Sequence, residues 1–333
     1  MGRAFLRGIS ATSVGLAVLL GAGCTSSTNG SGMTMVSGLE KTNLTVGAVP
    51  VADEAGLYIA KDDGLFAQEG LHVTIDSIVS SADATKGQND GQFDVTAGNA
   101  VSYIQDQVGH LSNLEIVAEG SLMEPDNQAL YTLARSPITT IAGLAGRRIG
   151  VNVLDNIGTL LISSVLEEHD VSIRKVHFVA MPFPEMAQAL HSHAIDAAWL
   201  PEPFGSEFSA TMGLQELCDL DQGATASFPV GWYVVTRAWA KKYPHTLAAF
   251  LAALRQAQEI ADTQRTAVEQ AMEKLPKPYT VPPMIASVMS LETYPLNIAP
   301  DIDEARVQRV ANAMYQFGLL SQPFHVSSML GGL

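Results

Sequence analysis

The sequence predicts an α/β protein of two lobes, each a mostly parallel sheet flanked by helices, joined by two crossover strands. Three observations support this prediction. Short apolar strand segments alternate with helical segments in two successive series, which is typical of parallel sheets covered by helices. Two β-rich segments, 128–135 and 230–237, flank the second series. The chain has 333 residues, 47% of them hydrophobic, which exceeds the usual size of one compact core.

The N-terminal segment precedes the predicted folded body. Two arginines are followed by an uncharged, mostly apolar stretch, which has the form of an export signal and is too short for a comfortable membrane span. The small residues before Cys24 resemble the bacterial lipobox, although Gly21 stands where that pattern prefers Leu, Val or Ile. We predict a signal peptide over 1–23 and a lipidated, flexible tether over 24–42. Plain signal cleavage and an uncleaved anchor are the alternatives.

The first series of elements predicts lobe 1, over 43–134 and 236–333. Its predicted strands are 44–49, 71–78, 93–97 and 114–119. Its predicted helices are 55–62, 65–69, 82–88 and 100–108. After the second β-rich segment the chain is expected to be mostly helical and to pack back on lobe 1, with helices at 244–265, 280–291 and 301–316.

The second series predicts lobe 2, over 135–235, inserted into lobe 1. Its predicted strands are 148–153, 176–180, 195–200 and 214–219. Its predicted helices are 160–169 and 184–193. The flanking β-rich segments are expected to be the crossovers. Two lobes joined by two strands form a cleft, and hinge closure around a ligand is the usual function of such a cleft.

Four motifs occur in order across roughly residues 44–240. They are Gly56-Leu-Tyr-Ile-Ala-Lys-Asp-Asp-Gly-Leu-Phe-Ala-Gln-Glu-Gly-Leu-His-Val, Gly91-Gln-Phe-Asp-Val-Thr-Ala-Gly-Asn, Ile141-Ala-Gly-Leu-Ala-Gly-Arg-Arg-Ile-Gly-Val and His193-Ala-Ile-Asp-Ala-Ala-Trp-Leu-Pro-Glu-Pro-Phe. Together they resemble the substrate-binding proteins of nitrate, sulfonate, taurine and thiamine-precursor importers, the NMT1/THI5-like or SsuA/TauA type. The resemblance implies a periplasmic-binding-protein-like (type II) fold, a small-molecule ligand and ABC permease transmembrane subunits as partners.

Candidate ligand contacts in lobe 1 follow the predicted strands. In open α/β lobes, ligands bind at the carboxyl ends of the parallel strands. Val51 and Ala52 follow the first strand, and Asn99 and Ala100 follow the third. Ser121 lies just beyond the fourth strand. We therefore expect these side chains or their backbone groups to meet the ligand.

Candidate contacts in lobe 2 lie at a helix start and around the second crossover. Asn156, Gly158 and Thr159 open a helix, whose free amides suit an anionic or carbonyl group, although Asn156 and Thr159 alternatively only cap that helix. Glu202 is expected either to bind a ligand amine or ring N–H, or to make a lobe–lobe contact or cap a turn. Phe228 is a candidate to stack on a ring.

Composition and missing motifs narrow the function. The net charge of −15 disfavours nucleic-acid binding. There is no Gly-x-x-x-x-Gly-Lys loop, and we expect no metal, cofactor or catalytic residue. The predicted function is that of a monomeric solute-binding lipoprotein of an ABC importer, anchored by lipid on the extracytoplasmic face of the cell membrane. The predicted solute is a sulfonate, a pyrimidine or a related nitrogen heterocycle. The alternatives are an enzyme of thiamine-pyrimidine synthesis on the same fold, or a lipid-anchored sensor.

Overall fold

Two five-stranded sheets organise residues 38–331, the part of the chain that the computed structural model describes. Sheet 1 has the strand order β2-β1-β3-β10-β4, and sheet 2 has the order β7-β6-β8-β5-β9. The strands of sheet 1 are β1 (Asn43–Ala48), β2 (His72–Ser77), β3 (Val95–Asn99), β4 (Leu114–Leu122) and β10 (Pro229–Thr236). The strands of sheet 2 are β5 (Gln128–Leu133), β6 (Arg148–Val151), β7 (His177–Ala180), β8 (Ala197–Pro201) and β9 (Leu214–Asp219). The predicted signal peptide, Cys24 and most of the predicted tether lie outside the described residues.

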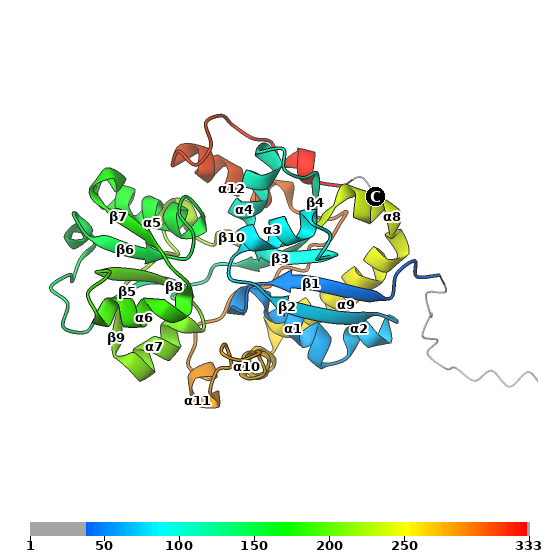
Figure 1. Cartoon of the computed structure of the whole chain (residues 1–333), viewed down its shortest axis with the longest axis horizontal. Coiled ribbons are helices and arrows are strands. Elements are labelled where there is room, and N and C mark those ends of the chain that lie inside the picture. Colours follow the sequence, from blue (N-terminus) through cyan, green and yellow to red (C-terminus); the bar gives the residue numbers. More distant parts are fainter. Residues whose placement is uncertain (1–37, 332–333) are drawn as a thin grey trace, which may run out of the picture. The chain divides into compact units, whose positions relative to one another are not determined.

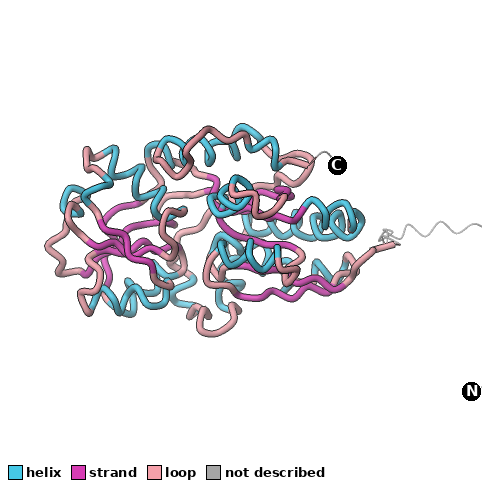
Figure 2. Tube along the Cα trace, turned by 45° about the horizontal axis from the view of Figure 1, so that its top comes forward, coloured by secondary structure: helices cyan, strands magenta, loops and turns pink. Residues whose placement is uncertain are grey.

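The two sheets share one topology. In each, the fourth strand runs antiparallel to both of its neighbours, and the other four strands share one direction. Each sheet is therefore mostly parallel, and the predicted two-lobed α/β fold is confirmed. Figure 2 shows the strands as two separate groups with helices around each. We call the body built on sheet 1 lobe 1 and the body built on sheet 2 lobe 2.

The structure places the crossings between lobes outside the two β-rich segments. β5 pairs with β8 and β9 inside sheet 2, and β10 pairs with β3 and β4 inside sheet 1. The chain crosses in the connections 123–127 and 220–228, whereas the sequence placed the lobe boundaries at 135 and 235. Both strands are almost wholly buried, as central strands are, and their composition alone does not distinguish a central strand from a connector.

Helices cover both faces of each sheet (Figure 1). Lobe 1 carries α1 (Ala55–Asp62), α2 (Leu65–Gln68), α3 (Ser81–Asn89), α4 (Ala100–Val108), α8 (Arg237–Lys242), α9 (Pro244–Thr263), α10 (Arg265–Glu273) and α12 (Glu304–Gln316). Lobe 2 carries α5 (Ile157–Glu168), α6 (Phe183–His191) and α7 (Phe204–Met212), and α11 (Pro283–Ala286) contacts α10 and α7. Short 3-10 helices are η1 (Ala52–Glu54), η2 (Ile141–Leu144), η3 (Ile173–Lys175), η4 (Gly223–Thr225) and η5 (Val326–Met329). None of the helices within residues 38–331 combines the length and hydrophobicity needed to cross a bilayer.

Two helical regions differ from the sequence prediction. The expected helix over 280–291 is only the single turn α11. Pro282 and Pro283 stand at its N-cap and first helical position, so the helix cannot begin at residue 280. The helix α7 was not predicted. It forms because the Glu202 carboxylate accepts a hydrogen bond from the Ser206 N–H at its start, and Gly213 ends it in the left-handed conformation at φ 67°.

Apolar side chains form two clusters. One lies between a face of sheet 1 and the helices α1, α2, α9 and α10. The other begins on the opposite face of sheet 1, under α4 and α12, and continues through the core of lobe 2. Because this second cluster includes residues of both sheets, the lobes share apolar packing beside the cleft that separates their strand ends.

Candidate functional site

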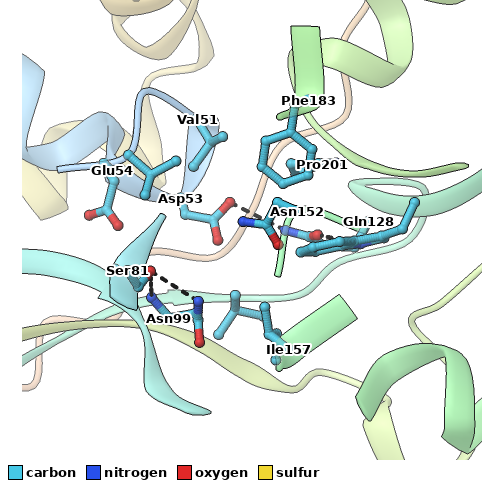
Figure 3. A pocket seen from close by; sticks show the side chains of 14 residues that line it. Val51, Asp53, Glu54, Ser81, Asn99, Gln128, Asn152, Ile157, Phe183 and Pro201 are labelled. Carbon is cyan, nitrogen blue, oxygen red and sulfur yellow. Dashed lines mark hydrogen bonds between the residues drawn. The ribbon is translucent and has the colours of Figure 1, made fainter. Parts of the chain in front are cut away.

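A small cavity lies where the carboxyl ends of strands from both sheets meet. It measures about 30 Å³, which holds roughly two water molecules. Lobe 1 contributes the residues after β1, the end of β3 and one position each from α3 and β10. Lobe 2 contributes positions at β5, after β6, at the starts of α5 and α6, and on β8. The lining residues are Val49, Val51, Asp53, Glu54, Ser81, Gly98, Asn99, Gln128, Asn152, Ile157, Phe183, Trp199, Pro201 and Val230 (Figure 3).

A chain of hydrogen bonds crosses the cavity from lobe 2 to lobe 1. The indole N–H of Trp199 donates to Oε1 of Gln128 at 3.1 Å, and Nε2 of Gln128 donates to Oδ1 of Asp53 at 3.3 Å (Figure 3). Trp199 is on β8 and Gln128 begins β5, whereas Asp53 lies in η1 after β1. The two donors in series orient the amide of Gln128 so that Asp53 is the acceptor at the end of the chain.

Three buried carboxyl groups gather on the lobe 1 side. Asp53 is 6% exposed, Glu54 is 1% exposed and Glu292 is 6% exposed. Burial raises the pKa of Asp53, while a hydrogen bond with Glu292 opposes that shift. Burial and the neighbouring Asp53 charge raise the pKa of Glu54 well above its ordinary value, and burial together with Asp53 does the same for Glu292. These carboxyls therefore hold protons more tightly than exposed ones do.

Some buried acceptors near the cavity have no hydrogen-bond partner. Among the described residues, these include Oε2 of Glu54. Oδ1 of Asn152, which lines the lobe 2 side, also has none. Buried polar atoms are normally paired, so unpaired acceptors on a cavity wall indicate a place where a ligand supplies the donor.

Aromatic rings form the lobe 2 wall. The rings of Phe183 and Trp199 meet edge to face, with centroids 5.3 Å apart and an interplanar angle of 71°. Gly158 lies directly against Trp199, since a Cβ at this position would come within 2.3 Å of the indole. Gly158, the second residue of α5, therefore leaves room for the indole beside the start of the helix.

Two further contacts hold the lobes together beside the cavity. The side chain of Asn156 donates to Oγ of Ser102 and to Oε1 of Gln105, both at 3.0 Å, so the starts of α5 and α4 meet. On the other side of the cavity the N–H of Ala52 donates to the carbonyl of Glu202 at 3.0 Å. These contacts describe a closed arrangement of the two strand-end edges.

The structure brings part of the predicted lobe 1 site to the cavity. Val51 and Asn99 line it. The Asn99 side chain also caps α4 by accepting from the Ser102 N–H, and it donates to Ser81. Ala52 and Ala100 are fully buried next to these two residues. Ser121 is buried on β4, with a hydroxyl that has no partner.

The predicted lobe 2 residues mostly lie beside the cavity. Asn156 caps α5 and bridges to α4, and Gly158 supports the indole of Trp199. Thr159 is buried, with an unpartnered hydroxyl. The Glu202 carboxylate accepts hydrogen bonds from Ser206 and from the Ser290 N–H, which corresponds to the capping alternative. Phe228 is fully buried, with the Arg309 guanidinium 5.8 Å from its ring centroid.

Several lining residues were missed from the sequence. Asp53, Glu54 and Asn152 lie in the connections that follow β1 and β6, and Pro201 ends β8, so a stricter use of the strand-end rule would have found them. Trp199, in the middle of β8, and the remaining lobe 2 residues carry no comparable signal. Within residues 38–331, no group of three His, Cys, Asp or Glu side chains is placed to hold a metal ion.

Comparison with known proteins gives a family and several relatives. The sequence profile of the family described as NMT1/THI5 like matches residues 51–264, well over half of the chain. The chain is 23% identical over 246 residues to the nitrate import ATP-binding protein NrtC of Synechocystis sp., covering 69% of this chain and 36% of that protein. It is 27% identical over 236 residues to the bicarbonate transport ATP-binding protein CmpC of the same organism, covering 66% and 35%. The chain thus spans about a third of the length of these curated relatives.

Solved structures share the fold at low sequence identity. The alkanesulfonate-binding protein SsuA from Xanthomonas axonopodis pv. citri superposes with a TM-score of 0.73 at 16% identity, covering 88% of this chain and 99% of that chain. The periplasmic nitrate-binding protein NrtA from Synechocystis PCC 6803 gives 0.71 at 14% identity, covering 87% and 85%. The desulfurization enzyme DSZB gives 0.65 at 16% identity, covering 87% and 96%. The same fold therefore supports both binding proteins and an enzyme.

Proposed function

Because the chain belongs to the NMT1/THI5-like family, we propose that it is the extracytoplasmic solute-binding component of an ABC import system. The resemblance predicted from the four sequence motifs is confirmed by the profile match. The proposal adds that a small organic solute enters between the lobes and that hinge closure encloses it. The closed form is then presented to a membrane permease.

The observation that supports this role is a cavity whose walls come from both lobes. Its lining residues lie at the carboxyl ends of strands in both sheets, and the Gln128–Asp53 hydrogen bond crosses it. At about 30 Å³ it is too small for an organic solute to enter without separation of the walls. A site of this kind binds by opening and closing, as a transport receptor must.

Partners in transport are proposed from the same reasoning. The curated relatives are named as ATP-binding proteins of nitrate import and of bicarbonate transport. This chain has no Gly-x-x-x-x-Gly-Lys loop, so ATP hydrolysis in our proposal belongs to another subunit. A transmembrane permease receives the solute from the closed form.

Export and lipid anchoring are part of the proposal. The apolar N-terminal stretch and the small residues before Cys24 support a cleaved signal over 1–23 and acylation of the cysteine. Expression in a bacterium with labelled palmitate is expected to label the wild type and leave Cys24→Ser unlabelled. Label retained by the variant, or a wild type found in the cytosol, would contradict the anchor.

We propose binding without catalysis, with an enzyme on the same fold as the alternative. DSZB supports the alternative at the level of fold alone. Mass spectrometry of the ligand after incubation and release separates the two roles. Unchanged ligand in stoichiometric amount is expected, and conversion with turnover would indicate an enzyme.

A ligand screen tests the binding role itself. Purified protein is melted with sulfonates, pyrimidines, amines, carboxylates and alcohols, and a true ligand at a hundred times its dissociation constant adds about 2.7 kcal/mol. Trp199→Phe removes the indole donor to Gln128 and is expected to weaken binding roughly fivefold. Trp239→Phe is the matched control, because its indole N–H likewise donates to a side-chain oxygen, Oδ1 of Asp94, outside the cavity. No stabilisation by any solute, or equal loss in both variants, would refute the proposed site.

A further inference from the structure

The charge balance of the cavity points to the chemistry of its ligand. Two of the lining side chains, Asp53 and Glu54, are carboxyls, and a third carboxyl, Glu292, interacts with Asp53 from behind the wall. Among the described residues that line the cavity, none is Lys, Arg or His. Burying a carboxylate without an opposite charge is costly. The cavity therefore favours a ligand that brings a positive charge.

Two other buried carboxylates in the described chain do have partners. Asp94 accepts hydrogen bonds from Lys41 and Trp239, and Glu119 accepts from Arg306 at 2.5 Å. Oε2 of Glu54, by contrast, has no partner although the residue is only 1% exposed. The unpaired acceptor on the cavity wall thus distinguishes Glu54 from these two carboxylates.

The surroundings of Glu54 offer no internal cation. Burial and the Asp53 charge both raise the pKa of the Glu54 carboxyl. The titratable groups that interact with Glu54 in the described structure are all acidic: Asp53, Glu292, Tyr58, Tyr103, Tyr233 and Tyr294. The hydroxyl of Tyr294 is already used, donating to the carbonyl of Ala52 at 2.9 Å. No positive charge of the described chain therefore compensates an ionised Glu54.

The opposite wall suits the rest of an organic molecule. Phe183 and Trp199 present aromatic surface, and Ile157 adds aliphatic surface. Aromatic faces also attract an ammonium group directly. An anion such as a sulfonate would instead meet Asp53 and Glu54 at short range, where like charges repel strongly in a buried site.

Resting on the proposed solute-binding role, we propose that this cavity takes a small organic cation. A protonated amine donates hydrogen bonds to Asp53 and Glu54, and its apolar part lies against Phe183 and Trp199. Oδ1 of Asn152 accepts a further N–H from the lobe 2 side. The ligand charge is thus opposite to that of the alkanesulfonates and nitrate that name the two structural relatives.

The test compares ligands that differ only in charge. Alkyl and benzyl amines, including quaternary ones, are titrated calorimetrically beside alcohols, carboxylates and sulfonates of the same carbon frames, and beside Zn²⁺ and Ca²⁺ alone. Phosphate buffer is used for the organic compounds, because common amine and sulfonate buffers are themselves candidate ligands. Zn²⁺ and Ca²⁺ are titrated in sodium chloride solution of matched pH, because their phosphates are insoluble. We expect binding by amines only, with affinity that rises with pH as the carboxyls give up their protons.

Substitutions of the two lining carboxyls test whether they bind the amine. Glu54→Gln and Asp53→Asn are each expected to weaken the tightest amine at least about tenfold. Glu259→Gln, an exposed glutamate on α9, is the matched control and is expected to change nothing. Both cavity variants are first melted to establish that they fold.

The other possible outcomes distinguish failure of the proposed cationic ligand from failure of the proposed binding role. Preference for a sulfonate, an alcohol or a bare metal ion refutes the cation, as does an amine affinity that Glu54→Gln leaves unchanged. If a sulfonate or an alcohol binds and Trp199→Phe weakens that binding, the proposed binding role is supported and the proposed cationic ligand is refuted. If no compound of any charge binds, both proposals fail together.

Discussion

Glu54→Gln is expected to stabilise the ligand-free protein at neutral and alkaline pH. The wild-type side chain is 1% exposed, and its Oε2 has no partner. Glutamine keeps the size of the side chain and removes the charge. Leaving a buried group uncompensated costs about 1–3 kcal/mol, so the variant should gain up to that amount and melt roughly 2–8 °C higher at pH 8.

The effect of Glu54→Gln on stability is expected to depend on pH. Burial and Asp53 hold the pKa of its carboxyl well above the ordinary 4.5 in the folded state. Below 4.5 the carboxyl is protonated in both the folded and unfolded states, and it costs nothing. As the pH rises from 4.5 toward the folded-state pKa, the unfolded state loses its proton first, so the wild type loses stability that the variant keeps.

Thermal melting between pH 4.5 and pH 8 measures this difference. The protein is first unfolded and refolded to remove any copurified ligand, which would otherwise neutralise the carboxyls. Glu259→Gln, exposed on α9, controls for the general effect of one lost charge. A variant that melts at or below the wild-type temperature at pH 8, or a gap that does not widen with pH, would refute the reasoning.

Three further substitutions test packing and charge elsewhere. Gly158→Ala should destabilise the fold by about 1–3 kcal/mol, because its Cβ would lie 2.3 Å from the indole of Trp199, and an unchanged melting temperature would contradict this. Arg306→Gln should cost about 3–5 kcal/mol by leaving the buried carboxylate of Glu119 without a positive partner, and a second change, Glu119→Gln, should restore part of the loss in the same melts. For Glu40, desolvation raises the pKa, but hydrogen bonds from Thr246 and His245 outweigh it and lower the pKa to about 2. Glu40→Gln should therefore lower the melting temperature at pH 7 and have a vanishing effect as the pH falls from 4.5 to about 2, and a constant difference would refute it.

Local sequence patterns were sufficient for most of the fold. Alternating apolar strands and helices marked every strand of both sheets within a few residues. The sequence does not predict that β5 joins sheet 2 and that β10 joins sheet 1. Both are short buried strands, and only tertiary contacts determine the sheet to which each belongs. The helix α7 was missed because Gly205, Ser206 and Ser209 weaken its intrinsic propensity, and its start depends on the carboxylate of Glu202.

The sequence predicted less of the candidate site than of the fold. The strand-end rule found Val51 and Asn99, and Asp53 lies in the same strand end as Val51. Sequence does not reveal that the Asp53 carboxyl is buried, since a carboxylate after a strand is usually exposed. Glu292 comes from the C-terminal third of the chain, and only the fold brings it against Asp53.

The polarity of the site follows from which groups the chain itself leaves unpaired. Helix starts were predicted to offer donors to an anion, yet Asn99 already accepts from the Ser102 N–H at the start of α4, and Asn156 accepts from the Ile157 N–H at the start of α5. The side chains of Ser102 and Asn156 then bond to each other across the lobes at 3.0 Å, so these donors serve closure. Acceptor oxygens of Glu54 and Asn152 remain free on the wall. Under our proposal these open acceptors select a ligand that carries hydrogen and positive charge.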